Sequence, residues 1–311
     1  MTSLPLVSVL MPCYRETADE FSESLDSILL QTYSRIEVII VFDDPNNDVL
    51  YRIAESRADY DNRIRLIKNE RNLGLSKALT KAFEFSHGEY ICRMDSDDIS
   101  VKYRIEHQFD YLRENNLDLV GSYLNAINEN GEVLYLVDAI PSSAASVKRA
   151  LAIRNCVPHP SWFGKRAVFE LGYRSVPLAE DYDLLLRALQ AGFSVGNVPE
   201  PLIYYRMTAD SISRKNLYDQ YLVSRILSSA YKRGHSLDVK EIAVRISFRS
   251  DQRVSMNYLK ANNWFNNGLQ LLTAGKKMQG LFQLARIPFI SRAYCKNLFN
   301  MIRVVAIKRL G

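Results

Sequence analysis

The feature of this sequence with the clearest chemistry is an apolar run that stops at three carboxylates within four residues. Asp95, Asp97 and Asp98 follow directly after the segment Tyr90–Met94. Because an unpaired buried charge costs several kcal/mol, we expect these acids at the exposed end of a strand. Their oxygens could bind Mg²⁺ or Mn²⁺, which prefer carboxylates, waters and phosphate oxygens. Taken alone, the motif could also be a solvated acidic turn that caps the next helix.

The surrounding pattern predicts how these acids are positioned. Four short apolar runs alternate with helical patterns, namely Leu6–Met11, Ile36–Phe42, Ile64–Ile67 and Tyr90–Met94. Such alternation predicts a parallel α/β sheet, and ligands bind beyond the carboxyl ends of its strands. We expect Pro12 to end the first strand. Three polar clusters at strand ends should therefore line one crevice: Pro12–Cys13–Tyr14, Asp43–Asp44 and Asp95–Asp98.

The second half of the chain changes character near residue 215. Leu119–Leu124 and Val133–Val137 are expected to be strands on either side of a turn at Asn130–Gly131. Pro201–Tyr205 is expected to be a further strand, and Glu180–Asp181 opens an amphipathic helix. Beyond Leu217 the pattern is helical, without further alternation of strands and helices. We therefore expect a domain over residues 1–215 and a helical extension over residues 216–311.

The bulk composition is ordinary, but the charge is uneven. The hydrophobic share of 47% and charged share of 24% are typical of globular proteins. The four cysteines are far apart and form no disulfide or zinc pattern, which fits a reducing, cytosolic setting. Residues 276–311, the basic tail, carry eight basic and no acidic side chains, so the rest of the +5 chain is net acidic. The tail could lie on an anionic membrane or dock on protein.

Six short motifs occur in a fixed order along roughly residues 5 to 215. They are Val7–Pro12, Val41–Asp44, Arg71–Leu75, Arg93–Asp98, His159–Ser161 and Glu180–Leu184. Each motif is weak alone, but together they resemble the family 2 glycosyltransferases, which are inverting enzymes with the GT-A fold. The resemblance implies an α/β fold with a mostly parallel, Rossmann-like central sheet flanked by helices, followed by the helical C-terminal extension.

The resemblance also implies a nucleotide-diphosphate sugar as donor, most often a UDP-sugar, bound in the amino-terminal half. The positions that match the family's donor contacts are Pro12, Tyr14, Glu16, Asp43, Asp44, Arg71, Asp95 and Ser96. Asp97, with Asp95, matches the ligands of Mn²⁺ or Mg²⁺, a cation that would neutralise charge on the departing diphosphate. Two alternatives stay open: Asp43–Asp44 could form only an Asx-type turn, and Arg71 could be a solvated surface side chain.

Asp181 matches the family's catalytic base. A positioned carboxylate would remove the proton of an acceptor hydroxyl as it attacks the anomeric carbon, which contributes on the order of 10²–10⁴-fold. We expect its pKa to be lowered, since a helix N-terminus favours negative charge. The alternative is that Glu180 and Asp181 only complement the helix dipole. His159, Glu180 and Arg206 are weaker candidates, either for contacts with the acceptor or for holding a loop.

One position departs from the family pattern. Thr208 stands where many relatives have a histidine near the diphosphate or metal, which weakens any third protein ligand, while Ser211 and Ser213 match the usual serines. The resemblance implies transfer to a glycan or lipid-linked acceptor during assembly of a capsule or lipopolysaccharide. The expected setting is the cytoplasm, with peripheral contact between the basic tail and the membrane, and without a nucleic-acid partner.

Three other functions remain as alternatives. A nucleotidyltransferase acting on a sugar phosphate would need a glycine-rich basic loop after the first strand, whereas Pro12–Glu16 contains no glycine. A non-catalytic nucleotide-sugar-binding protein would not need both Asp97 and Asp181. A processive polysaccharide synthase would need membrane spans and a Q-x-x-R-W motif, and the sequence has neither.

Overall fold

A nine-stranded sheet forms the centre of the molecule, with the strand order β3-β2-β1-β4-β8-β6-β9-β5 and with β7 paired to β6. The computed structural model describes residues 4–207, 216–248 and 251–310. The strands are β1 (Val7–Cys13), β2 (Ile36–Phe42), β3 (Ile64–Lys68), β4 (Tyr90–Arg93), β5 (Ile99–Ser100), β6 (Leu119–Ile127), β7 (Val133–Val137), β8 (Phe163–Lys165) and β9 (Val195–Arg206).

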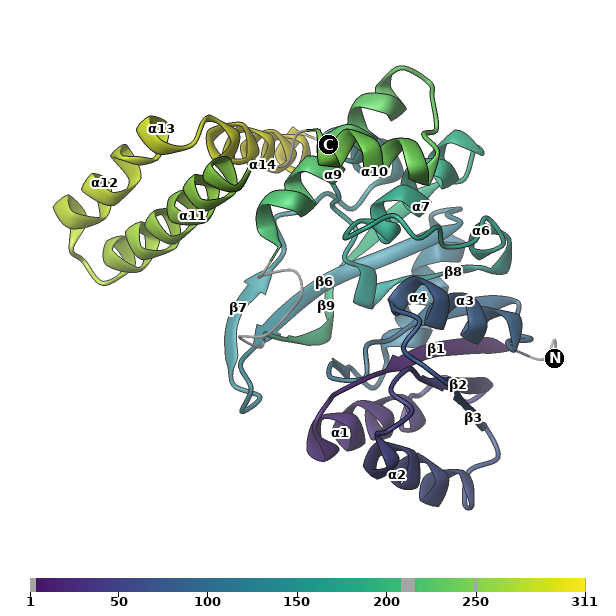
Figure 1. The fold of residues 1–311 in the computed structure, drawn as a ribbon. Helices are drawn as coiled ribbons and strands as arrows, with labels where there is room; N and C mark the ends of the chain where they lie inside the picture. The colour runs from purple at the N-terminus through teal and green to yellow at the C-terminus, as the bar shows by residue number, and fades with distance from the viewer. Residues whose placement is uncertain (1–3, 208–215, 249–250, 311) are drawn as a thin grey trace.

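Helices flank the sheet and then continue as a helical C-terminal region (Figure 1). Those before residue 207 are α1 (Ala18–Leu29), α2 (Asp48–Ala58), α3 (Leu75–Glu84), α4 (Arg104–Glu114), α5 (Ala144–Leu151), α6 (Arg166–Phe169) and α7 (Glu180–Gln190), with a 3₁₀ turn at His159–Ser161. Those after it are α9 (Leu217–Lys232), α10 (Val239–Ser247), α11 (Gln252–Thr273), α12 (Lys277–Ala285), α13 (Ile287–Ile290) and α14 (Arg292–Leu310).

The first four main strands form the parallel half of the sheet, as predicted. β1 pairs in parallel with β2 and with β4, and β2 pairs in parallel with β3. Side chains alternate between the faces of a strand, so Val9 belongs to the hydrophobic cluster shared with α1, and Leu10 to the cluster shared with α3. The expectation that Pro12 ends the first strand is wrong, because Pro12 aligns with Val41 and β1 continues to Cys13.

The second half of the sheet is mixed. β8 is antiparallel to both β4 and β6, while β6 and β9 are parallel. The predicted turn between β6 and β7 is confirmed, and Gly131 adopts a φ of 81° there, a region that glycine enters without steric cost. β9 is longer than the expected strand, since it begins at Val195. The sequence pattern did not predict β8, which spans only three residues, or helices α4 and α5.

The C-terminal helices pack on the sheet domain through α9. Val223 and Ile226 of α9 lie in the same hydrophobic cluster as Leu185 of α7. A smaller cluster joins α9, α11 and α14 around Tyr258 and Tyr294. Figure 1 shows α11 and α12 running side by side and projecting away from the sheet. None of the helices in the described ranges is long and apolar enough to cross a lipid bilayer.

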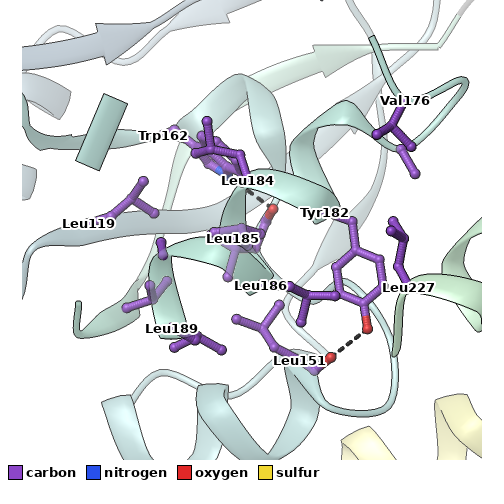
Figure 2. Close-up of a cluster of buried hydrophobic side chains, with 14 of the residues drawn as sticks. Leu119, Leu151, Trp162, Val176, Tyr182, Leu184, Leu185, Leu186, Leu189 and Leu227 are labelled. Carbon is purple, nitrogen blue, oxygen red and sulfur yellow. Dashed lines mark hydrogen bonds between the residues drawn. The ribbon is translucent and has the colours of Figure 1, made fainter. Parts of the chain in front are cut away.

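Core packing fixes the start of α7, the helix that begins with Glu180 and Asp181. The side chain of Tyr182 is 1% exposed, and its hydroxyl donates a hydrogen bond to the carbonyl oxygen of Leu151. Figure 2 shows this bond within a cluster that also contains Leu185 of α7 and Trp162. The backbone next to Asp181 is therefore anchored by buried side chains on the neighbouring residue and on the following turn.

Candidate active site

A cavity of about 630 Å³ brings together side chains that lie far apart in the sequence. Asp95 and Asp97 line it from the segment after β4, and Glu180 and Asp181 line it from the start of α7. Glu16, from the segment after β1, also contributes to its wall. The acidic segment after β4 therefore meets the acidic start of α7 in one place. Of the three strand-end clusters expected to line one crevice, only Asp95–Asp98 lines this cavity, whereas Pro12–Cys13–Tyr14 and Asp43–Asp44 do not.

The acidic segment after β4 has the composition of a divalent-cation site. One carboxylate oxygen from each of Asp95, Asp97 and Asp98 lies within 4.8 Å of the others. Asp98 is fully buried; its Oδ1 accepts a hydrogen bond from the backbone N–H of Arg206 at 2.8 Å, and its Oδ2 has no partner in the described part of the chain. This all-oxygen donor set fits Mg²⁺ or Mn²⁺.

The electrostatics of this segment also support a divalent-cation site. Burial, together with the negative charges of Asp95 and Glu16, raises the pKa of Asp97 to about 7. Burial also raises the pKa of Asp98, helped by the two neighbouring aspartates. A bound cation would favour the charged carboxylates and oppose both shifts. The sequence singled out Asp95 and Asp97 as ligands but did not assign a role to Asp98.

Arg93 is a buried cation between the two acidic segments. Its guanidinium pairs with the carboxylate of Asp95, and its Nε has no partner among the described residues. The positive charge of Arg93 lowers the pKa values of Asp97, Glu180 and Asp181, although burial outweighs it at each of them. The sequence alone assigned no role to Arg93. Its position at the end of a strand, just before the acidic residues, was the feature that could have identified it.

Arg206 holds the acidic segment in place. Its side chain is almost fully buried, and its Nε donates to the carbonyl oxygen of Asp97 at 2.9 Å. Its other nitrogens bind Glu23 of α1 at 2.8 Å and the carbonyl oxygen of Glu129 in the β6–β7 turn at 2.9 Å. Arg206 lines the cavity, but its donors are occupied by protein acceptors, so its role in this geometry is to position Asp97.

Asp181 is held by two hydrogen bonds at the amino-terminal end of α7. The amide Nδ2 of Asn155 donates to Oδ2 at 2.7 Å, and the backbone N–H of Tyr182 donates to Oδ1 at 2.6 Å. The expectation of a lowered pKa is wrong, because burial raises the pKa of Asp181 more than these donors and Arg93 lower it. Burial and the charge of Asp181 raise the pKa of Glu180 to about 7. The sequence did not identify Asn155.

His159 lies in the cavity wall and also fastens its loop. The imidazole is buried, with Nε2 2.9 Å from the hydroxyl of Tyr173 and its ring centroid 4.5 Å from that of Trp162. Burial and the positive charge of Arg93 lower the pKa of His159 well below its usual range. The imidazole is therefore neutral near pH 7, and its hydrogen bond to Tyr173 fixes the ring orientation.

Asp43 positions a loop that forms part of the cavity wall. Its Oδ1 accepts hydrogen bonds from Asn69 at 2.7 Å and from the backbone of Leu73 at 2.9 Å, and its Oδ2 accepts one from the backbone of Gly74 at 2.8 Å. Leu73 and Gly74 line the cavity, whereas Asp43 does not. The carboxylate thus fixes the loop that supplies Leu73 and Gly74 to the cavity wall.

The remaining predicted donor contacts lie around the ends of β1 and β2. Glu16 accepts a hydrogen bond from the backbone of Tyr14 at 2.8 Å, and the hydroxyl of Ser96 donates to the carbonyl oxygen of Pro12 at 2.8 Å. The bond from Ser96 ties the end of β1 to the acidic segment, and the bond from Tyr14 orients Glu16.

Asp44 and Arg71 lie further out. Asp44 pairs with the exposed Arg15 at 3.3 Å, and the exposed Arg71 does not line the cavity. Thr208, Ser211 and Ser213 lie outside the described residues.

Comparison with known proteins gives consistent matches. The family model described as Glycosyl transferase family 2 matches residues 8–172. The O-antigen biosynthesis glycosyltransferase WbnJ of Escherichia coli is 35% identical over 223 residues, which cover 69% of this chain and 84% of WbnJ. WfgD of Escherichia coli, a UDP-Glc:alpha-D-GlcNAc-diphosphoundecaprenol beta-1,3-glucosyltransferase, is 32% identical over 128 residues, which cover 41% of this chain and 49% of WfgD.

The fold is also found in solved structures. The crystal structure of S. aureus TarS 1-349 in complex with UDP-GlcNAc matches with a TM-score of 0.58 at 14% identity, covering 98% of this chain and 91% of that chain. The similarity extends over the sheet and the helices after it, and it confirms the predicted fold class.

Proposed function

Since the chain belongs to glycosyl transferase family 2, we propose that it moves a sugar, with inversion, from a UDP-sugar to a hydroxyl of a glycan or lipid-linked acceptor. One observation carries this proposal: a single cavity contains both a carboxylate cluster suited to a divalent cation and an oriented carboxylate, Asp181. The UDP-sugar named for WfgD and the UDP-GlcNAc bound to TarS support the choice of donor.

On the donor side, Asp95 and Asp97 would hold Mn²⁺ or Mg²⁺, which supplies charge neutralisation for the departing diphosphate. Arg206 and Asp98 keep Asp97 in place through the contacts described above. Arg93 adds a positive charge that the solvent does not screen, because its side chain is buried. The loop fixed by Asp43 and the end of β1 near Glu16 would then enclose the uridine.

On the acceptor side, Asp181 would take the proton of the acceptor hydroxyl. A new bond forms between that oxygen and the anomeric carbon while the bond from this carbon to the diphosphate oxygen breaks, and its electron pair leaves with UDP. Asn155 and the backbone N–H of Tyr182 hold the carboxylate in one orientation, which fixes where an acceptor hydroxyl must lie. Its raised pKa makes Asp181 a stronger base than an exposed aspartate.

We place the reaction in surface-polysaccharide assembly at the inner face of the cytoplasmic membrane. The names of WbnJ and WfgD support this setting. The α12–α13 region exposes apolar side chains close in sequence to basic ones: Met278, which follows Lys277, is 81% exposed, and Phe289, between Arg286 and Arg292, is 93% exposed. Apolar side chains with flanking cations are typical of peripheral membrane binding.

The proposal is tested by UDP release. We expect the purified chain to hydrolyse slowly at least one UDP-sugar of a nucleotide-sugar panel when Mn²⁺ or Mg²⁺ is present, because water can replace the acceptor. Excess EDTA should stop the reaction. Release of pyrophosphate from a nucleoside triphosphate and a sugar phosphate, with no hydrolysis of any UDP-sugar, would favour a nucleotidyltransferase instead.

A further inference from the structure

A second cavity, of about 210 Å³, also has Asp181 in its wall. Three residues line both this cavity and the 630 Å³ cavity, namely Leu178, Asp181 and Gln220. Asp181 therefore lies where the two cavities meet. Leu178 has a φ of 61°, a left-handed conformation that costs energy for a residue with a branched side chain and that is frequent at functional sites.

The second cavity contains polar groups that lack partners. The hydroxyl of Tyr221 is buried and makes no hydrogen bond within the described ranges. Arg154 also lines this cavity; burial lowers the pKa of its guanidinium, and no carboxylate of the described chain pairs with it. Unpaired buried polar groups cost free energy. The Tyr221 hydroxyl, a hydrogen-bond donor, and the Arg154 guanidinium, a cation without a carboxylate partner, therefore indicate that the cavity binds a ligand with acceptor oxygens.

A third cavity, of about 300 Å³, continues from the second toward the surface. The two share Ile153, Arg225 and Asn300. Lys232 and Lys296 also line the third cavity, and its described wall contains no acidic residue. Partial burial and the nearby charge of Arg303 lower the pKa of Lys232. A cluster of basic side chains without acidic partners is typical of an anion-binding site.

We propose that the second and third cavities form the acceptor site, and that the acceptor carries a phosphate or diphosphate. This inference rests on the proposed function. The sugar of the acceptor would lie in the second cavity, with its hydroxyl at Asp181. The phosphate would lie against Arg154 and Arg225, and Lys232 and Lys296 would face the part of the acceptor nearer the surface.

Binding of two simple probes tests this assignment. The full-length chain is titrated calorimetrically with inorganic pyrophosphate and with farnesyl diphosphate, in excess EDTA so that no cation assists binding at the donor site. We expect both probes to bind, and we expect Arg154→Gln and Arg225→Gln each to weaken binding by about tenfold or more, the loss expected when one charge-assisted contact is removed. Arg233→Gln, an exposed arginine outside the cavity walls, is the matched control and should bind as the wild type does.

Every outcome decides for or against the assignment. Tighter binding of farnesyl diphosphate assigns the site to a lipid-linked acceptor, and binding of pyrophosphate that is equal or tighter assigns it to a soluble phosphorylated one. Failure of the wild type to bind either probe overturns the proposal, as does unchanged binding by Arg225→Gln, which is exposed and should fold even if Arg154→Gln does not. Release of UDP by the wild type without acceptor tests the proposed function separately.

Discussion

At the scale of single residues, the orientation of Asp181 is the feature on which the proposed chemistry depends. One oxygen accepts from Asn155 and the other from the backbone of Tyr182. These bonds favour the charged carboxylate, while burial disfavours it and outweighs them. The carboxylate is therefore a stronger base than usual, and its pKa depends directly on Asn155.

Removal of the Asn155 amide should shift the pH dependence of catalysis. Asn155→Ala removes a donor that stabilises the charged form, so the pKa of Asp181 should rise further. The base is lost as pH falls through its pKa, so the acidic limb of kcat/KM should move to higher pH by roughly one unit. The pH–rate profile measures this at saturating metal. Asn115→Ala, at the exposed residue directly after α4, is the control, and an unmoved limb in Asn155→Ala would remove Asn155 from the site.

Asp97 should be essential for metal-dependent donor binding. Asp97→Ala removes a carboxylate from the cluster and should abolish transfer and weaken UDP binding in Mn²⁺ or Mg²⁺, with the circular dichroism spectrum unchanged. Calorimetric titration with UDP measures the effect, and the exposed Asp110→Ala serves as control. Full activity of the wild type in excess EDTA would show that the cation has no part in the mechanism.

Sequence patterns reveal some of these residues and hide others for physical reasons. Asp97 and Asp181 stand in local motifs at the ends of recognisable elements. Asn155 is 26 residues before Asp181 and reaches it only through the tertiary fold. Arg93 was hidden because an arginine in an apolar strand is identified as buried only when its partner, Asp95, is seen beside it.

At the scale of elements, the parallel half of the sheet was predictable because its strands are covered on both faces and are therefore apolar throughout. β8 is too short for a periodic pattern, and most of β9 beyond the expected strand lies before Pro201, a residue that breaks the strand signal. Asp95 and Asp97 after β4 line the cavity together with Glu16, whereas the predicted cluster Pro12–Cys13–Tyr14 does not, and Asp43 after β2 positions a loop.

The helical region should bind anionic membranes reversibly. Contacts between basic side chains and an anionic surface are worth about 1 kcal/mol each near that surface. Three or four contacts from the eight basic side chains of residues 276–311 are therefore enough for salt-sensitive binding. We expect the protein to sediment with phosphatidylglycerol-containing vesicles at low ionic strength and to be released as salt rises.

Charge reversal separates this membrane interaction from docking on protein. Arg292, Lys296 and Arg303, changed together to Glu, should prevent vesicle binding at any ionic strength. Lys308 is a poorer choice for this change because it already contacts Asp138. Vesicle binding that responds to neither salt nor these charges would assign the tail to docking on protein.

At the scale of the whole molecule, Asp181 lies between the 630 Å³ cavity, the proposed donor site, and a pair of cavities formed with the C-terminal helices. In the proposed reaction, the segment after β4 would supply the cation ligands and the start of α7 the base, and residues of α9, α11 and α14 line the cavity proposed for the acceptor. The hydrophobic clusters that include α9 hold these parts together. Under the proposed assignment of the cavities, Asp181 would act on the acceptor.

The measurement that tests this account most directly is the transfer rate of Asp181→Asn. The substitution keeps the shape of the side chain and removes its basicity. We predict that kcat falls by about 10²-fold or more while the affinity for the donor stays nearly unchanged. If Asp181→Asn keeps half of the wild-type transfer rate, then Asp181 is not the base and the central claim is contradicted.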